Sequence, residues 1–190
     1  MINELLEKIK RPLTIEYCTD YLRKKGIATL SYDETIVRFK LYDLNFDLSY
    51  EQERLVLRTS FLLGDKLDYE CMLRAINKVN LERWIVKTYI DSQIVKNKDE
   101  SETEERSITF SFESFCLSRA AFCKLYEFAI YALNDCIEFH KQCYNQFLEQ
   151  KNSSLEKSTN KIGFNCHPET ETTEHQPKER KQNHRIGFIQ

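Results

Sequence analysis

Residues 36–49, Ile-Val-Arg-Phe-Lys-Leu-Tyr-Asp-Leu-Asn-Phe-Asp-Leu-Ser, alternate between apolar and polar side chains on either side of Tyr42-Asp43. Successive side chains of a strand point to opposite faces, so this alternation is typical of strands that bury one face. The two halves predict strands over residues 36–41 and 44–49, joined at Tyr42-Asp43. The next run, Arg54 to Leu63, is apolar at both parities apart from Arg58, which predicts a central strand covered on much of both faces.

Segments with helical spacing of apolar residues lie before and after these strands. Thr14 can cap a helix that buries Ile15, Cys18 and Leu22 and stops at Gly26. Asp68 precedes a second helix with apolar residues at helical spacing. Asn77 and Asn80 are expected to close the end of that helix, because Asn tolerates left-handed backbone geometry. Ser118 can cap the last helix, whose apolar positions repeat to Phe147 over about eight turns.

Two further strands are expected between the second and last helices. One begins at Trp84 and includes Val86, Thr88 and Ile90, and the other alternates from Ile108 to Phe112. The link between them, Lys96 to Arg106, sets five acidic residues against three basic ones. With little apolar surface to bury, the link is predicted to be a solvated hairpin arm with the conformation of a loop.

The order of elements predicts the α+β class. Neighbouring strands are joined by links too short for parallel crossovers, so the sheet should be antiparallel. The prediction is a five-stranded antiparallel sheet with helices packed on it, in the order α-β-β-β-α-β-β-α, within residues 1–150. Residues 151–190 are polar and contain two of the three prolines, so they are expected to form a disordered tail.

Composition excludes several classes of function. Among 190 residues, 28 basic and 30 acidic side chains leave a net charge of −2, so no excess of positive charge favours nucleic acid as a partner. No run approaches the roughly 18 apolar residues of a membrane span. Acidic residues at the start argue against a secretory signal, and the seven cysteines include no CxxC pair. We therefore expect a cytoplasmic protein with reduced cysteines in its core.

The sequence gives only weak signals for catalytic or metal sites. Cys136, His140 and Cys143 share one helical face, but the outer two α-carbons would lie about 10 Å apart along the axis. Zinc needs its ligands within about 2.3 Å of one centre, so buried packing is the favoured interpretation. The predicted domain contains no second histidine and only Gly26 and Gly64, which disfavours nucleophilic and phosphate-loop enzymes. No enzyme activity, cofactor or metal is predicted.

The tail contains one small repetition. A basic residue precedes Ile-Gly-Phe twice, as Lys161-Ile162-Gly163-Phe164 and Arg185-Ile186-Gly187-Phe188. Extended segments of this kind can add to a sheet edge and place Ile and Phe in pockets. These residues are the candidate partner-binding sites, and coincidence in a low-complexity segment is weighted equally. Cys166 and the tail histidines match no known set of metal ligands.

Several motifs in order resemble the YbjN-like family, which has a type III secretion chaperone-like fold. The resemblance covers residues 13–148. Its most specific part is an Asn-x-x-Asn helix end followed by a Lys-x-x-x-Asp strand. It rests on residues 15–26, 33–40, 73–80, 87–91 and 110–115. The family implies a small bacterial cytosolic domain that binds other proteins, chaperone-like or regulatory, with no catalytic residues to transfer.

We therefore predict a non-enzymatic module that binds a polypeptide partner through its sheet or helix surface. Such a surface should expose an apolar patch or an uncapped edge strand, and either feature would also allow a homodimer. One alternative is an adaptor of a larger complex that acts through its tail motifs. A small-molecule-binding protein or an enzyme is the other, and it would need a concave pocket of converging polar groups.

Overall fold

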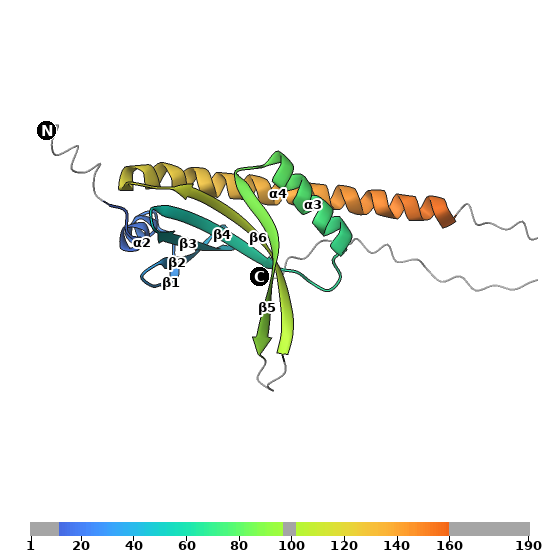
Figure 1. Ribbon diagram of the computed structural model, residues 1–190, viewed down its shortest axis with the longest axis horizontal. Coiled ribbons are helices and arrows are strands. Elements are labelled where there is room, and N and C mark those ends of the chain that lie inside the picture. The colour runs from blue at the N-terminus through green and yellow to red at the C-terminus, as the bar shows by residue number, and fades with distance from the viewer. Residues whose placement is uncertain (1–11, 97–101, 160–190) are drawn as a thin grey trace, which may run out of the picture.

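The computed structural model describes residues 12–96 and 102–159, which form one antiparallel sheet with helices against it (Figure 1). This confirms the α+β class and the antiparallel sheet. The described helices are α2 (Ile15–Lys24), α3 (Tyr69–Glu82) and α4 (Arg119–Thr159). The strands are β1 (Thr29–Tyr32), β2 (Ile36–Leu41), β3 (Leu44–Glu51), β4 (Arg54–Leu62), β5 (Val86–Lys96) and β6 (Glu102–Phe115). None of the helices in these ranges is both long and apolar enough to cross a bilayer.

The sheet has six strands in the order β1-β2-β3-β4-β6-β5, so the prediction of five strands was wrong. The missed strand is β1, whose four residues are half-buried or exposed and show no alternation of burial. Leu30 and Tyr32 alternate with Thr29 and Ser31, but the run is only four residues long and both apolar side chains are exposed, so the pattern is too short to predict a strand. It pairs with β2 across a register shift and forms one edge of the sheet.

Two-residue turns join β2 to β3 and β3 to β4. Tyr42 and Asp43 have φ values of 52° and 63°, and Gln52 and Glu53 have 49° and 63°. Positive φ at both central residues is the geometry that hairpin turns need to match the twist of their strands. The predicted turn at Tyr42-Asp43 is confirmed.

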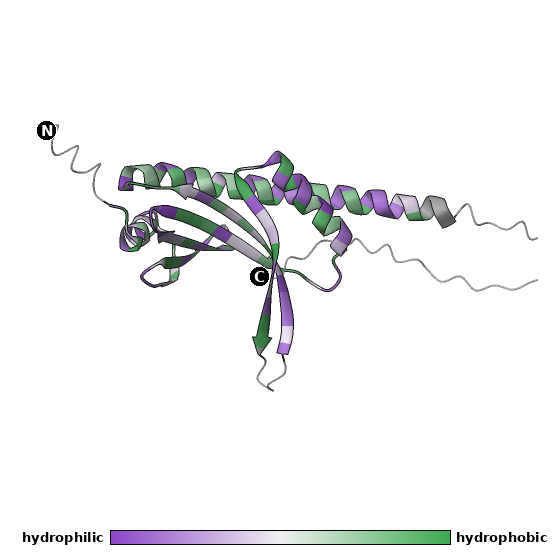
Figure 2. Ribbon diagram, in the orientation of Figure 1, coloured by the Kyte–Doolittle hydropathy of each residue, from purple (hydrophilic) through white to green (hydrophobic). Residues whose placement is uncertain are grey.

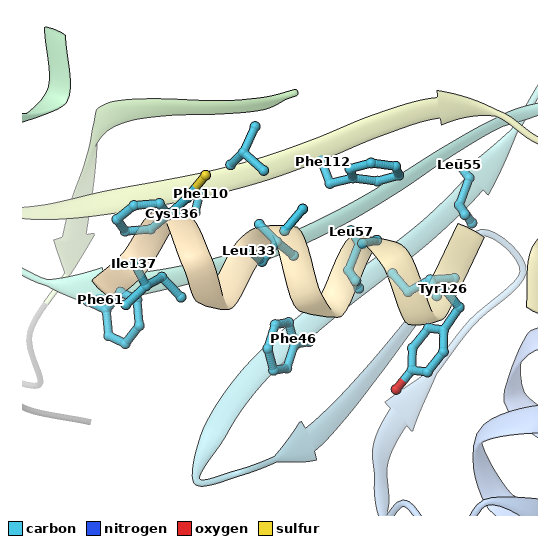
Figure 3. Packing of buried hydrophobic residues seen from close by; sticks show 14 of the residues in the cluster. Phe46, Leu55, Leu57, Phe61, Phe110, Phe112, Tyr126, Leu133, Cys136 and Ile137 are labelled. Atoms are coloured by element: carbon cyan, nitrogen blue, oxygen red, sulfur yellow. The ribbon is translucent and has the colours of Figure 1, made fainter. Parts of the chain in front are cut away.

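The helices lie together on one face of the sheet. Tyr21 of α2 packs edge-on against Phe122 of α4 at 5.3 Å, and α3 packs along α4. Figure 3 shows the middle of α4 with Leu133 and Ile137 above strand residues that include Phe46. The opposite face has no helix over it among residues 12–96 and 102–159. In β4, Arg58, Ser60 and Leu62 are exposed, so the predicted cover on both faces of that strand was wrong except at Val56.

Predicted helix starts are confirmed at all three caps. Thr14, Asp68 and Ser118 each accept a hydrogen bond from a backbone N–H three residues on. Helix α4 is 41 residues and about 60 Å long, and it continues nine residues beyond the predicted domain end at Gln150. Lys151 pairs with Asp68 at 2.7 Å and with Glu70 at 3.1 Å, which ties this extension to the start of α3.

The charged link belongs to a hairpin arm, as expected, but residues 102–106 are strand, so the prediction of a loop was wrong there. Strand β5 reaches Lys96, β6 begins at Glu102, and the two residues pair. The hairpin projects beyond the rest of the sheet as a two-stranded arm, hydrophobic at the end of β5 and hydrophilic at the start of β6 (Figures 1 and 2). A ladder of backbone hydrogen bonds forms without a buried face, so charge did not prevent it.

The expected role of Asn77 and Asn80 was also wrong. Helix α3 continues through both to Glu82. Asn80 instead bonds sideways to β5: its Nδ2 donates to the Thr88 carbonyl and its Oδ1 accepts from the Thr88 N–H, both at 2.8 Å. The amide fits because Thr88 presents both backbone groups on the outer side of the edge strand.

Candidate functional site

The predicted tail sites lie outside the described residues. This holds for Ile162, Gly163, Phe164, Ile186, Gly187 and Phe188, and also for Cys166, His167, His175 and His184. The docking-peptide hypothesis therefore remains a prediction.

Cys136, His140 and Cys143 lie in the core, as their buried-packing interpretation predicted. Their exposed fractions are 2%, 1% and 3%. The His140 ring packs edge-on against Phe110 at 5.7 Å, and burial lowers the pKa of His140 to about 4. Burial raises the pKa of Cys136 to about 11, so this thiol is a poor nucleophile at neutral pH.

The open face of the sheet carries a polar row, although Leu62 and Tyr89 are also exposed on this face. One row of outward residues crosses five strands: Arg38, Asp47, Arg58, Ser111 and Lys87. Arg38 and Asp47 form an ion pair at 3.2 Å, and both side chains are more than half exposed. An apolar partner segment would gain little here, because it would have to desolvate these charges. The apolar surface that a binding module needs must lie elsewhere.

That surface lies at the edge of the sheet, where β6 runs past the start of β5. Val86, the first residue of β5, pairs with Phe112, so residues 113–115 of β6 extend beyond it. The turn after α3 and the first part of α4 close the other sides and form a groove of about 590 Å³. We call it the aromatic groove, and its lining residues are Arg54, Trp84, Ile85, Lys87, Ser111, Phe112, Glu113, Ser114, Phe115, Leu125 and Phe128.

Large apolar side chains of the groove are exposed. Trp84, the single tryptophan of the chain, is 81% exposed, and Phe115 is 76% exposed. Phe128 is 46% exposed and packs edge-on against the buried Phe112 at 5.9 Å, which fixes its ring on the core. Exposed aromatic rings held on a rigid scaffold are the usual anchors of protein interfaces.

A small charged cluster forms the polar wall of the groove. Arg54 and Lys87 both bond to Glu113, whose side chain is 19% exposed, and Lys87 Nζ lies 3.4 Å from Glu113 Oε2. The hydrogen bond from Arg54 is the main cause that lowers the pKa of Glu113, with the charge of Lys87 in support. Two cations against one anion leave this wall with one net positive charge.

The sequence prediction placed the groove residues in elements but did not identify the site. Trp84 was expected to begin a strand, yet it lies in the turn before Val86. Phe128 and Tyr131 were passed over because they fall outside the buried stripe of α4, and Tyr131 is 71% exposed. Aromatic residues off the apolar stripe of a helix were the available signal. Nothing in the sequence places Trp84 and Phe115 beside that helix.

Comparisons with known proteins give a structural likeness but no match by sequence. No family model matches the chain, and no curated protein was found to be similar to it. Among solved structures, the chain is similar to the crystal structure of YbjN from E. coli, a proposed transcription regulator. The identity is 8%, the TM-score is 0.49, and the match covers 73% of this chain and 94% of that one. The likeness concerns the arrangement of helices and strands and says nothing of activity.

Proposed function

We propose that the protein is a non-enzymatic binding module that takes an apolar segment of a partner polypeptide into the aromatic groove. The observation that carries this proposal is the exposure of Trp84 and Phe115 beside Phe128 on a groove formed by three elements. Burying one such ring in a partner contributes roughly 2–3 kcal/mol. A sheet backed by a 41-residue helix keeps the rings in place before the partner arrives.

The shape of the groove favours a polypeptide over a small molecule. Pockets for small ligands bury most of the ligand surface. Here Trp84 and Phe115 are themselves largely exposed, so the groove is an open trough. A polypeptide can place two or three apolar side chains along such a trough and cover its rims with backbone and polar groups.

The charged wall favours a partner segment that carries a carboxylate next to its apolar residues. Arg54 and Lys87 leave one positive charge uncompensated beside the rings. Such a charge contributes orientation and specificity more than affinity. The chain's own Ile-Gly-Phe motifs fit this wall less well, because Lys161 and Arg185 precede them. We therefore assign the groove to an acidic apolar segment of another protein.

The lining chemistry supports a binding role rather than catalysis. The residues around the groove include serines and one glutamate, but no cysteine or histidine that could pair with them. Glu113 is engaged by two cations that keep it ionised, which makes it a weak general base.

Trp84 makes the proposal directly measurable. Peptides displayed as a random library would be selected on the full chain, synthesised and titrated while the emission of Trp84 is followed. We expect selected peptides to combine aromatic or aliphatic residues with Asp or Glu, and to shift the emission of Trp84 to shorter wavelength. The paired variant Phe115→Ala and Phe128→Ala should weaken their binding at least tenfold, since each ring supplies buried area.

Tyr42→Asn is the matched control. It removes another exposed aromatic ring, 75% exposed, at a turn where Asn tolerates the positive φ. Binding should stay within twofold of the wild type. If peptides bind equally well to the paired groove variant, or bind without changing Trp84 emission, the groove is not the site. Loss of binding in Phe164→Ala with Phe188→Ala instead would favour the adaptor alternative.

A further inference from the structure

The two edges of the sheet differ in how they are protected. The β1 edge is four residues long and carries a register shift, both of which discourage pairing with another strand. The β5 edge is eleven residues long, contains no Pro or Gly, and pairs with β6 without a register shift from Val86 to Lys96. A long, regular edge of this kind is a template for strand addition.

The backbone groups that point away from the sheet can be identified. The Thr88 N–H and carbonyl face outward, because both bond to the side chain of Asn80. Backbone direction alternates along a strand, so Ile90, Ser92 and Ile94 also face outward. The hydrogen bonds of β6 support this assignment. The Arg106 carbonyl accepts from the Leu63 N–H on the β4 side, so Ser107 and Glu105 are the residues of β6 that bond to β5.

Asn80 therefore protects only Thr88, which follows the outward Val86, whose N–H donates to the Arg83 carbonyl. Within residues 12–96 and 102–159, no hydrogen bond joins another residue to the outward N–H or carbonyl of Ile90, Ser92 or Ile94. The side chain of Ile94 is 71% exposed. Helix α3 lies at the other end of β5, so the arm edge is open to a strand (Figure 1).

We infer that this edge pairs with β5 of a second copy of the chain, antiparallel about a two-fold axis at Ser92. In this register Ser92 faces Ser92 of the second copy, and Ile90 faces the second copy's Ile94. These outward residues make hydrogen-bonded pairs, each exchanging two backbone bonds. The side chains of each Ile90 and Ile94 pair stand on one face, where cross-strand aliphatic contacts stabilise the pairing.

In this register the β5 edge is complementary to itself, and we therefore assign it to a second copy of the chain. On the other face Asp91 meets Gln93 of the second copy, and Tyr89 meets Val95, so no like charges are opposed. A two-fold axis at Ile90 instead would require the outward groups of Thr88, which Asn80 already occupies. Antiparallel pairing also places the two sheets at opposite ends of the paired arms, so the helices stay apart.

The test is the mass of the full chain as a function of concentration, by sedimentation velocity, for wild type and edge variants. Ser92→Pro removes an outward N–H without removing a bond to β6, because Ser92 does not face that strand. Ser92→Ala is its matched control, which changes the same side chain and keeps the N–H. We expect a reversible dimer in the wild type and in Ser92→Ala. The dissociation constant of Ser92→Pro should be at least tenfold higher.

A second pair of variants covers the case in which Ser92→Pro fails to fold. Ile94→Lys sets a charged side chain against Ile90 of the second copy in place of an aliphatic contact and should disrupt the dimer, whereas Leu30→Lys, on the β1 edge and 59% exposed in the wild type, should not. A wild type that stays monomeric at its highest soluble concentration would overturn the inference. A dimer that survives both Ser92→Pro and Ile94→Lys would overturn it too. The paired groove variant should still dimerise, which separates this interface from the proposed peptide site.

Discussion

His140 places an ionisable ring in the core without full hydrogen bonding. Its Nε2 is buried and has no hydrogen-bond partner among the described residues. Burial lowers the pKa of the ring to about 4, from the ordinary 6.5. The folded state therefore holds this side chain neutral, and protonation favours the unfolded state.

The sign of the pH effect follows from that direction. Because the pKa of His140 is lower in the folded protein, folding need not deprotonate the ring above pH 6.5, and stability is lost as pH falls from 6.5 toward about 4. At 1.36 kcal/mol per pKa unit, the loss by pH 4.5 is roughly 2–3 kcal/mol. Urea unfolding at pH 7 and pH 4.5 should show this loss in the wild type and a correspondingly smaller one in His140→Leu. Equal losses in both proteins would contradict the buried neutral ring, since carboxylate effects are common to the two.

Asn80 is the second residue with an identifiable role in stability. Asn80→Ala removes both side-chain hydrogen bonds to Thr88 and should lower the free energy of unfolding by roughly 1–3 kcal/mol. Asn80→Asp keeps the acceptor for the Thr88 N–H but turns a carboxylate oxygen toward the Thr88 carbonyl oxygen, so its loss should be at least as large. Urea unfolding measures the free energy, and hydrogen exchange at the Thr88 amide reports the local effect. An unchanged exchange rate in Asn80→Ala would show that the edge is held by other contacts.

Helix α4 is the element that ties the molecule together. Its buried side includes Phe122, Ala129, Leu133 and Ile137, which lie over the sheet. Helix α3 packs along α4, and α2 reaches it through the ring of Tyr21 against Phe122. Figure 3 shows Leu133 near the middle of this stripe. The structure therefore predicts that α4 contributes to the core along several turns, well before its extension past Gln150.

Leu133→Ala tests the contribution of that stripe. Leu133 is fully buried, so the change should cost 2–5 kcal/mol, on the order expected for a cavity in a core that cannot collapse. Tyr131→Ala, two residues away and 71% exposed in the wild type, should change stability by less than about 0.5 kcal/mol. The midpoint of urea unfolding compares the two. Similar losses for both variants would mean that α4 does not pack on the sheet by the side assigned here.

At the scale of the whole molecule, the sequence predicts the parts that depend on local periodicity. Alternation from residue 36 to 48 gives the central hairpin, and three capping side chains give the helix starts. It fails where structure depends on the backbone alone, as in the short β1 and in the charged arm, because neither buries an apolar face. The alternation of Leu30 and Tyr32 in β1 spans four residues, which is too short a pattern to separate a strand from a loop.

The aromatic groove is a property of the assembled fold. Trp84 comes from a turn, Phe115 from the end of β6, and Phe128 from α4. Only the antiparallel pairing of β5 with β6, ending at Val86, and the return of α4 over the sheet bring them together. The sequence supported an apolar binding surface in general. To locate this surface, one must know the strand order β4-β6-β5, in which β6, the last strand in the chain, pairs with β4 as well as with β5.

The most direct test of the proposed function is a map of amide and indole shifts in isotope-labelled full chain, titrated with a selected acidic apolar peptide. We predict that the indole N–H signal of Trp84 shifts most, together with the amide signals of Phe115 and Phe128. The amide signals of Arg38 and Asp47, on the open face, should shift little. Shifts gathered on Arg38, Asp47 and Arg58, or confined to residues 160–190, with Trp84 unchanged, would contradict the assignment of the groove.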